Sequence, residues 1–184
     1  MTANRRTPPD RRTLGEGGNE GPHLDGGRPT ACRMRRCTAH DAPLLTRIAH
    51  ASKASWGYPS EMLALWDVDL TLEPDFVERH DVWAAVAGDE AVGFYAVTGD
   101  RPGREIEHLW VAPGWMGHGV GRRMVEHLLE RARAAGADEV RVVSDPHAAG
   151  FYMRMGARQV GEEPSVPAGR RLPVLVIPLL GADR

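Results

Sequence analysis

Residues 109–124 have the sequence LWVAPGWMGHGVGRRM, and this stretch decides how the chain folds. A β-rich run comes first, glycines stand at positions 114, 117, 119 and 121, and an amphipathic helical pattern follows. Glycines in this setting let backbone N–H groups converge on an anion, and a helix N-terminus adds partial positive charge. Arg122 and Arg123 lie in the first helical turn, where the helix dipole disfavours cations, so an anion such as a diphosphate would suit that end.

Two common phosphate motifs do not match the glycine spacing. The dinucleotide motif GxGxxG needs a third glycine where Arg122 stands, and the P-loop needs a lysine where Val120 stands. A glycine turn that serves only close packing of strand against helix is the other interpretation. Spacing alone leaves both the phosphate cradle and the packing turn open.

Strand and helix patterns alternate on both sides of this stretch. We expect helices from an N-cap at Asp41 to about Ser55, from Ser60, from Pro74, at 120–135 and at 148–155. We expect strands at 32–38, 82–87, 91–98, 105–111, 139–144, 158–160 and 172–180. The short polar connection after residue 87 joins two of them as a hairpin. This order predicts an α/β (α+β) fold, a single domain whose mixed, mainly antiparallel central sheet is flanked by helices.

Composition separates a tail from a folded domain. The 184 residues are 42% hydrophobic and 26% charged, which suits one soluble domain. The first thirty residues hold six glycines and four prolines and few apolar side chains, so they cannot bury enough surface to offset their conformational entropy. We therefore expect a disordered N-terminal tail at 1–30 and the folded domain at 31–184.

Charge and cysteine usage narrow the classes of partner. The net charge of −2 gives no reason to expect nucleic acid, and no apolar run approaches a membrane span. The N-terminus lacks the apolar core of a signal peptide, and Cys32 and Cys37 form no disulfide framework. A cytoplasmic protein with no membrane partner is the resulting prediction.

A second block strengthens the anion-site interpretation. Residues 111–121 resemble the acetyl-CoA loop of the GNAT superfamily of N-acetyltransferases, written Q/R-x-x-G-x-G/A, with Met116 in place of Gln or Arg. Residues 145–157, DPHAAGFYMRMGA, resemble the same family's N-x-x-A-x-x-F-Y-x-x-x-G-F segment, with Asp145 for Asn and Ala157 for Phe. The resemblance implies a GNAT-like fold, acetyl-CoA as co-substrate and these cofactor-binding residues: Leu109, Trp110, Val111, Met116, Gly117, His118, Gly119, Val120, Gly121, Arg122, Asp145 and Phe151.

Direct acetyl transfer from a thioester needs a neutral amine, a stabilised oxyanion and a protonated leaving thiolate. The resemblance implies Tyr152 as general acid, although a core aromatic would look the same. It also implies a glutamate base on the preceding strand. Strand alternation puts Glu107 on one face with Leu109 and Val111. The alternative to a catalytic role is that Glu107 forms an ion pair with Arg104 or Arg141. His108, on the opposite face, is the second candidate base.

The aromatic residues Trp56, Tyr58 and Trp66 lie where this superfamily builds its acceptor pocket, so they are candidate substrate-binding residues. They could equally be packing residues of short helices. The eight histidines show no metal-ligand spacing, so we expect no metal. The apolar C-terminal strand at 172–180 could pair across a homodimer.

The sequence thus predicts an acetyltransferase that moves an acetyl group from acetyl-CoA to an amine acceptor, either a small molecule or a protein N-terminus. The first alternative is a non-catalytic acyl-CoA-binding regulatory module of the same fold. The second is a nucleotide- or nucleic-acid-binding domain, which the failed phosphate motifs and the net charge disfavour.

Overall fold

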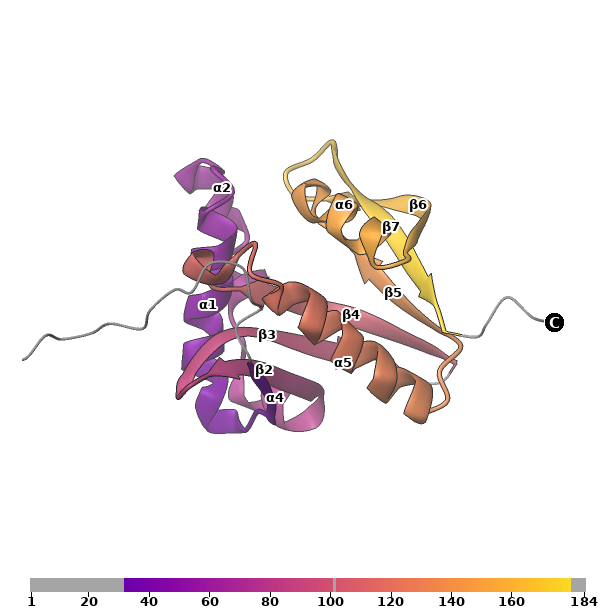
Figure 1. The fold of residues 1–184 in the computed structure, drawn as a ribbon. Coiled ribbons are helices and arrows are strands. Elements are labelled where there is room, and N and C mark those ends of the chain that lie inside the picture. Colours follow the sequence, from indigo (N-terminus) through magenta and orange to yellow (C-terminus); the bar gives the residue numbers. More distant parts are fainter. Residues whose placement is uncertain (1–31, 101, 180–184) are drawn as a thin grey trace, which may run out of the picture.

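The computed structural model describes residues 32–100 and 102–179 (Figure 1). The predicted tail at 1–30 lies outside the described residues. Figure 1 shows strands β2 (Asp81–Ala87) to β4 (Gly103–Val111) with α1 (Ala42–Ala54) on one side of the molecule, and β5 (Glu139–Val143) to β7 (Arg170–Pro178) with α6 (Pro146–Arg154) on the other.

Seven strands form one sheet in the order β1-β2-β3-β4-β5-β7-β6. All neighbours are antiparallel except β4 and β5, which run parallel, so the predicted mixed, mainly antiparallel sheet is confirmed. The strands are β1 Arg33–Arg36, β2 Asp81–Ala87, β3 Glu90–Thr98, β4 Gly103–Val111, β5 Glu139–Val143, β6 Arg158–Ser165 and β7 Arg170–Pro178.

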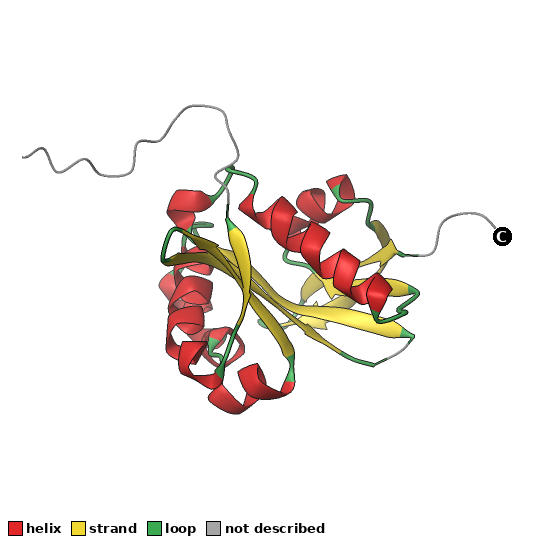
Figure 2. Cartoon of the chain, turned by 60° about the horizontal axis from the view of Figure 1, so that its bottom comes forward, coloured by secondary structure: helices red, strands yellow, loops and turns green. Residues whose placement is uncertain are grey.

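Helices cover both faces of this sheet (Figure 2). Helix α5 buries an apolar stripe that includes Val120, Met124 and Leu128 against one face, as its period predicts. Helix α1 buries Leu45, Ile48 and Ala49 against the other. The helices are α1 Ala42–Ala54, α2 Ser60–Leu65, α3 Asp67–Leu70, α4 Pro74–Arg79, α5 Val120–Ala134 and α6 Pro146–Arg154, with short 3-10 turns at Ala39–Asp41 and Pro113–Trp115.

Helix α1 has Asp41 at its N-cap position and Ser55 at its C-cap, as predicted, although the Asp41 carboxylate accepts the Thr38 backbone N–H and bonds no amide of α1. The bounds of α6 and β6 differ from the predicted ones. Helix α6 begins at Pro146, which suits a first helical position because it has no N–H to satisfy. Strand β6 continues through Pro164, which an edge strand tolerates because one side of it needs no ladder hydrogen bonds.

The expectation that the C-terminal strand pairs with a second copy in a homodimer is wrong. Strand β7 pairs with β5 on one side and with β6 on the other, so both of its edges are already used within the chain. The outer strands of the sheet are β1 and β6. The apolar residues of this strand are those of an interior strand that packs on α6 and the core.

The central strands separate next to the site, and a bulge lies at the same point. Pairing of β4 with β5 ends at Ile106 and Val142. On the other edge of β4, Ala96 pairs with His108 and Val97 with Ile106, which leaves Glu107 as an extra residue. The simple alternation of this strand breaks at the bulge, because Ile106 belongs to the core against which Leu109 and Val111 pack, while Glu107 and Leu109 still line the same cavity.

Candidate active site

The glycine loop between β4 and α5 has the backbone geometry that its sequence predicts. Gly117 and Gly119 have φ angles of 79° and 81°, a left-handed conformation that residues with a Cβ rarely adopt. Gly121 faces α6, where a Cβ would lie in van der Waals contact with the Phe151 ring at 3.4 Å. The loop can thus turn sharply into α5 while α5 and α6 pack closely.

A hollow of about 380 Å³ lies over this loop and brings together residues of both sequence blocks. Ten predicted site residues line it: Trp56, Leu109, Val111, Met116, Gly117, Gly119, Gly121, Arg122, Phe151 and Tyr152. His118 and Val120 border a different hollow, and Val120 is buried in the core. Trp110 packs toward the core on the α1 face.

The start of α5 supplies donors for an anion. The first amides of a helix have no acceptor within it, and this helix carries no acidic residue in its first turn. The Arg122 guanidinium donates to Glu126 at 2.7 Å, so this exposed cation has a partner one turn along the helix. The backbone at 119–122 therefore offers donors that suit an anion, and the Arg122 side chain lies beside them.

A second cavity of about 70 Å³ occupies the place where β4 and β5 separate. Glu107 and Tyr152, the predicted base and acid, both line it. The 380 Å³ hollow adjoins this cavity, and the two share the residues Trp56, Leu109, Ala148 and Tyr152. The bulge in β4 leaves Glu107 exposed to solvent on one side and at the cavity on the other.

The surroundings of Tyr152 and His108 set their proton chemistry. Burial raises the pKa of Tyr152 above its ordinary value, so the phenol is protonated at neutral pH. Burial lowers the pKa of His108 to about 4, and its ring lies against Phe76 and Phe94 in the α1-side core. His108 accepts a hydrogen bond from Trp110 at 3.3 Å and borders neither site cavity, so of the two candidate bases Glu107 is the better placed.

The three aromatic residues predicted to bind the acceptor lie together, but they surround Lys53, which is not among the predicted site residues. Lys53 at the end of α1 is buried, and its ammonium lies 5.1, 5.0 and 4.5 Å from the ring centroids of Trp56, Tyr58 and Trp66. The Trp110 ring, at 5.9 Å, is a fourth wall. We call this group, with Lys53 inside it, the lysine box. One signal was available: Lys53 is the only lysine among 23 basic Lys and Arg residues.

Asp145 is predicted to bind the cofactor, but its carboxylate is engaged by protein groups. It accepts from Lys53 at 2.5 Å, Arg170 at 2.8 Å, Tyr58 at 3.0 Å and the backbone N–H of His147 at 3.0 Å. Burial alone would raise the pKa of Asp145, but these hydrogen bonds outweigh it and the pKa is lowered. The residue caps α6 and pairs with the lysine box.

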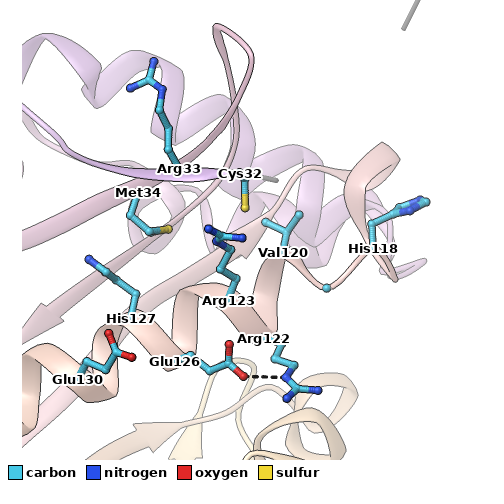
Figure 3. A pocket seen from close by; sticks show the side chains of 11 residues that line it. Cys32, Arg33, Met34, His118, Val120, Arg122, Arg123, Glu126, His127 and Glu130 are labelled. Atoms are coloured by element: carbon cyan, nitrogen blue, oxygen red, sulfur yellow. Dashed lines mark hydrogen bonds and ion pairs between the residues drawn. The ribbon is translucent and has the colours of Figure 1, made fainter. Parts of the chain in front are cut away.

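Another hollow, of about 810 Å³, lies on the other flank of α5 (Figure 3). Its lining includes Cys32 and Met34 of the β1 region and Arg123, Glu126 and His127 of α5. It meets the 380 Å³ hollow at Gly119 and Arg122 but contains neither Glu107 nor Tyr152.

The described part of the chain has no candidate metal centre and no candidate membrane-spanning helix. No group of three or more His, Cys, Asp or Glu residues in it could hold a metal ion. No helix in the same residues is long and apolar enough to cross a bilayer.

Known proteins with a similar sequence are acetyltransferases. Residues 45–157 match the model of the acetyltransferase (GNAT) family. The chain is 32% identical over 105 residues to the peptidyl-lysine N-acetyltransferase YjaB of Salmonella typhimurium, covering 56% of this chain and 68% of that protein. It is 28% identical over 139 residues to the Escherichia coli protein of the same name, covering 66% of this chain and 90% of the relative.

Solved structures share the fold at lower identity. A GCN5-related N-acetyltransferase from Rhodopseudomonas palustris aligns with a TM-score of 0.69 at 23% identity, over 85% of this chain and 99% of that one. The PaiA N-acetyltransferase of Thermoplasma acidophilum, solved with coenzyme A, aligns with a TM-score of 0.63 at 14% identity, over 80% and 99%. The family match covers more than half of the chain, so this protein is a GNAT-family N-acetyltransferase.

Proposed function

We propose that this enzyme transfers an acetyl group from acetyl-CoA directly to a primary amine at the cavity between β4 and β5. The observation that carries the proposal is that Glu107 and Tyr152 border one space of about 70 Å³ where the two strands separate. The larger hollow over the glycine loop opens next to it. A donor held over the loop can thus reach the proposed acid and base.

The chain offers fitting groups for each part of acetyl-CoA. Amides at the start of α5, with Gly117 and Gly119 in left-handed conformations, suit the diphosphate. Beyond Ile106, the backbone groups of β4 that point toward β5 have no ladder partner there. Those at Leu109 to Val111 are the groups that we assign to the pantetheine and to the developing oxyanion.

In this mechanism Glu107 accepts the proton of the acceptor ammonium, directly or through water. The neutral nitrogen forms a bond to the thioester carbon, the carbon–sulfur bond breaks, and the nitrogen releases its second proton to water as it becomes an amide. Tyr152 donates its proton to the leaving thiolate, whose pKa as a free thiol is about 8.5, and regains one from solvent. No acyl-enzyme is needed, and Cys32 and Cys37 lie buried away from both cavities as free thiols.

The acceptor class is a primary amine of a peptide or small molecule. Two relatives carry names that make them peptidyl-lysine acetyltransferases, so a lysine side chain joins the N-terminus and the small amine as a candidate acceptor. The cytoplasmic location remains a prediction from the sequence, and so does a homodimer, although β7 does not supply its interface.

The direct test is a mass-shift screen with acetyl-CoA and matched peptides. One peptide has a free N-terminus and no lysine, a second has a blocked N-terminus and one lysine, and a third has neither amine. We expect one added acetyl group on an amine-bearing acceptor and equal release of CoA thiol. A protein that binds acetyl-CoA yet modifies no amine in this panel or in a small-amine panel would contradict the proposal.

A further inference from the structure

The lysine box joins the two sides of the separated sheet next to the proposed reaction site. Lys53 and the four rings come from α1, the segment after it and β4. Asp145 and Arg170 come from the other side, at the start of α6 and on β7. Trp66 also donates to the Val166 carbonyl at 3.0 Å, next to the β6–β7 turn. These contacts bridge the separation beyond the last β4–β5 pair.

The box is built for a lysine. Of the 23 Lys and Arg residues of the chain, all except Lys53 are arginines. If arginine fitted at position 53, we would expect an arginine there too. Four rings lie within 4.5 to 5.9 Å of one nitrogen, a spacing that fits a compact ammonium. A guanidinium is larger and planar, and Arg170 already lies against the outer side of Trp66 at 4.7 Å.

Asp145 links this box to the reacting groups. Its carboxylate caps α6 through the His147 N–H, and α6 carries Tyr152. Asp145 itself lines the 70 Å³ cavity together with Glu107 and Tyr152. A shift of Asp145 would therefore move the start of α6 and change how the acid lies relative to the base.

On the basis of the proposed function, we propose that Lys53 is a positioning residue for acetyl transfer. Its boxed ammonium fixes Asp145 at the start of α6 and so sets the place of Tyr152 opposite Glu107. The ammonium itself takes no part in the proton transfers, because the rings enclose it and it lines neither site cavity.

The test compares Lys53→Met, which keeps the length without the charge, with Lys53→Arg, which keeps the charge. We expect both to lower kcat by about tenfold or more, because small misplacements of reacting groups have effects of that order. The KM for acetyl-CoA should change little, because the donor is held by the glycine loop. Activities are compared per folded molecule at a temperature well below each variant's Tm.

Arg35→Met is the matched control, since Arg35 pairs with Asp41 near the other end of α1 at 2.7 Å. It should lower Tm without changing kcat. Tyr58→Phe keeps its ring and removes only the hydroxyl bound to Asp145, so it carries the same test if both Lys53 variants fail to fold. The expected result there is a smaller fall in kcat, and an unchanged kcat would count against the inference.

A second readout does not depend on turnover. Lysine labelled with ¹⁵N gives one side-chain signal, because the chain has one lysine. We expect a slowly exchanging ammonium signal that Asp145→Asn shifts and Arg35→Met does not. A fast-exchanging, solvent-like signal, or wild-type kcat in both Lys53 variants, would overturn the positioning role alone. A wild-type enzyme that acetylates no amine would overturn the proposed function and this inference with it.

Discussion

The ammonium of Lys53 lies 2.5 Å from a carboxylate oxygen of Asp145, and each side chain is less than a tenth exposed. The two residues are 92 positions apart in the sequence. Burying such a pair costs desolvation, which the surrounding rings, Tyr58 and the α6 amide help to offset. This contact ties the acceptor side of the site to the helix that carries Tyr152.

Removal of the Asp145 charge should destabilise the fold. Asp145→Asn leaves Lys53 and Arg170 buried without their shared anion, and breaking a buried pair typically costs about 3–5 kcal/mol. Urea unfolding at pH 7 measures this loss. A loss below about 1 kcal/mol, as for an exposed ion pair, would show that the pair is solvated in solution.

The same carboxylate predicts a pH dependence of stability. The folded-state pKa of Asp145 is lowered, so its contribution is present above the unfolded pKa of about 3.9 and is lost as the pH falls through the folded value. The free energy of unfolding should therefore fall below about pH 4. The fall should be smaller in Asp145→Asn. Equal acid sensitivity of the two proteins would contradict a lowered pKa at this residue.

Loss of the Tyr152 hydroxyl should lower turnover and leave binding nearly unchanged. Tyr152→Phe keeps the buried ring and its packing, while kcat should fall by about 10²-fold for the loss of one general acid. Steady-state kinetics and calorimetry of acetyl-CoA binding separate the two effects. If turnover stayed at the wild-type value with chemistry rate-limiting, water would be the proton donor and Tyr152 a core residue.

Glu107→Gln should lower kcat at neutral pH. The variant cannot take the amine proton, so its rate should rise with pH as more acceptor is neutral in solution, and approach wild type at high pH. The pH–rate profile measures this. His108→Gln is the comparison, because His108 packs in the α1-side core, and it should keep the wild-type profile. The reverse pattern would reassign the base to His108.

A side chain at Gly119 should weaken donor binding. Its φ of 81° is strained for valine, and the branched side chain would stand where the loop faces the hollow, so affinity for acetyl-CoA should fall at least tenfold, about 1.4 kcal/mol. Gly88→Val is the control, since Gly88 also has a positive φ but lies in the β2–β3 turn. Calorimetry that finds equal affinity in both variants would move the phosphate site elsewhere.

The sequence by itself determined the features that depend on local chemistry. The helical period at 120–134, the glycines with positive φ and the two blocks at 111–121 and 145–157 were enough to predict the order of elements, the mainly antiparallel sheet and the family. Each is a property of neighbouring residues, such as a backbone conformation that only glycine adopts readily or one apolar face of a helix.

Only the tertiary structure decided the rest. The bulge that sets Glu107 at the cavity depends on how β3 and β4 pair, and the interior place of β7 depends on where β6 returns. Asp145 resembled a cofactor ligand by its motif, yet its partners Lys53, Tyr58 and Arg170 lie 92, 87 and 25 positions away. Pairing between distant segments leaves no periodic or spacing signal, so a lone lysine in an arginine-rich chain was the only sign of the box.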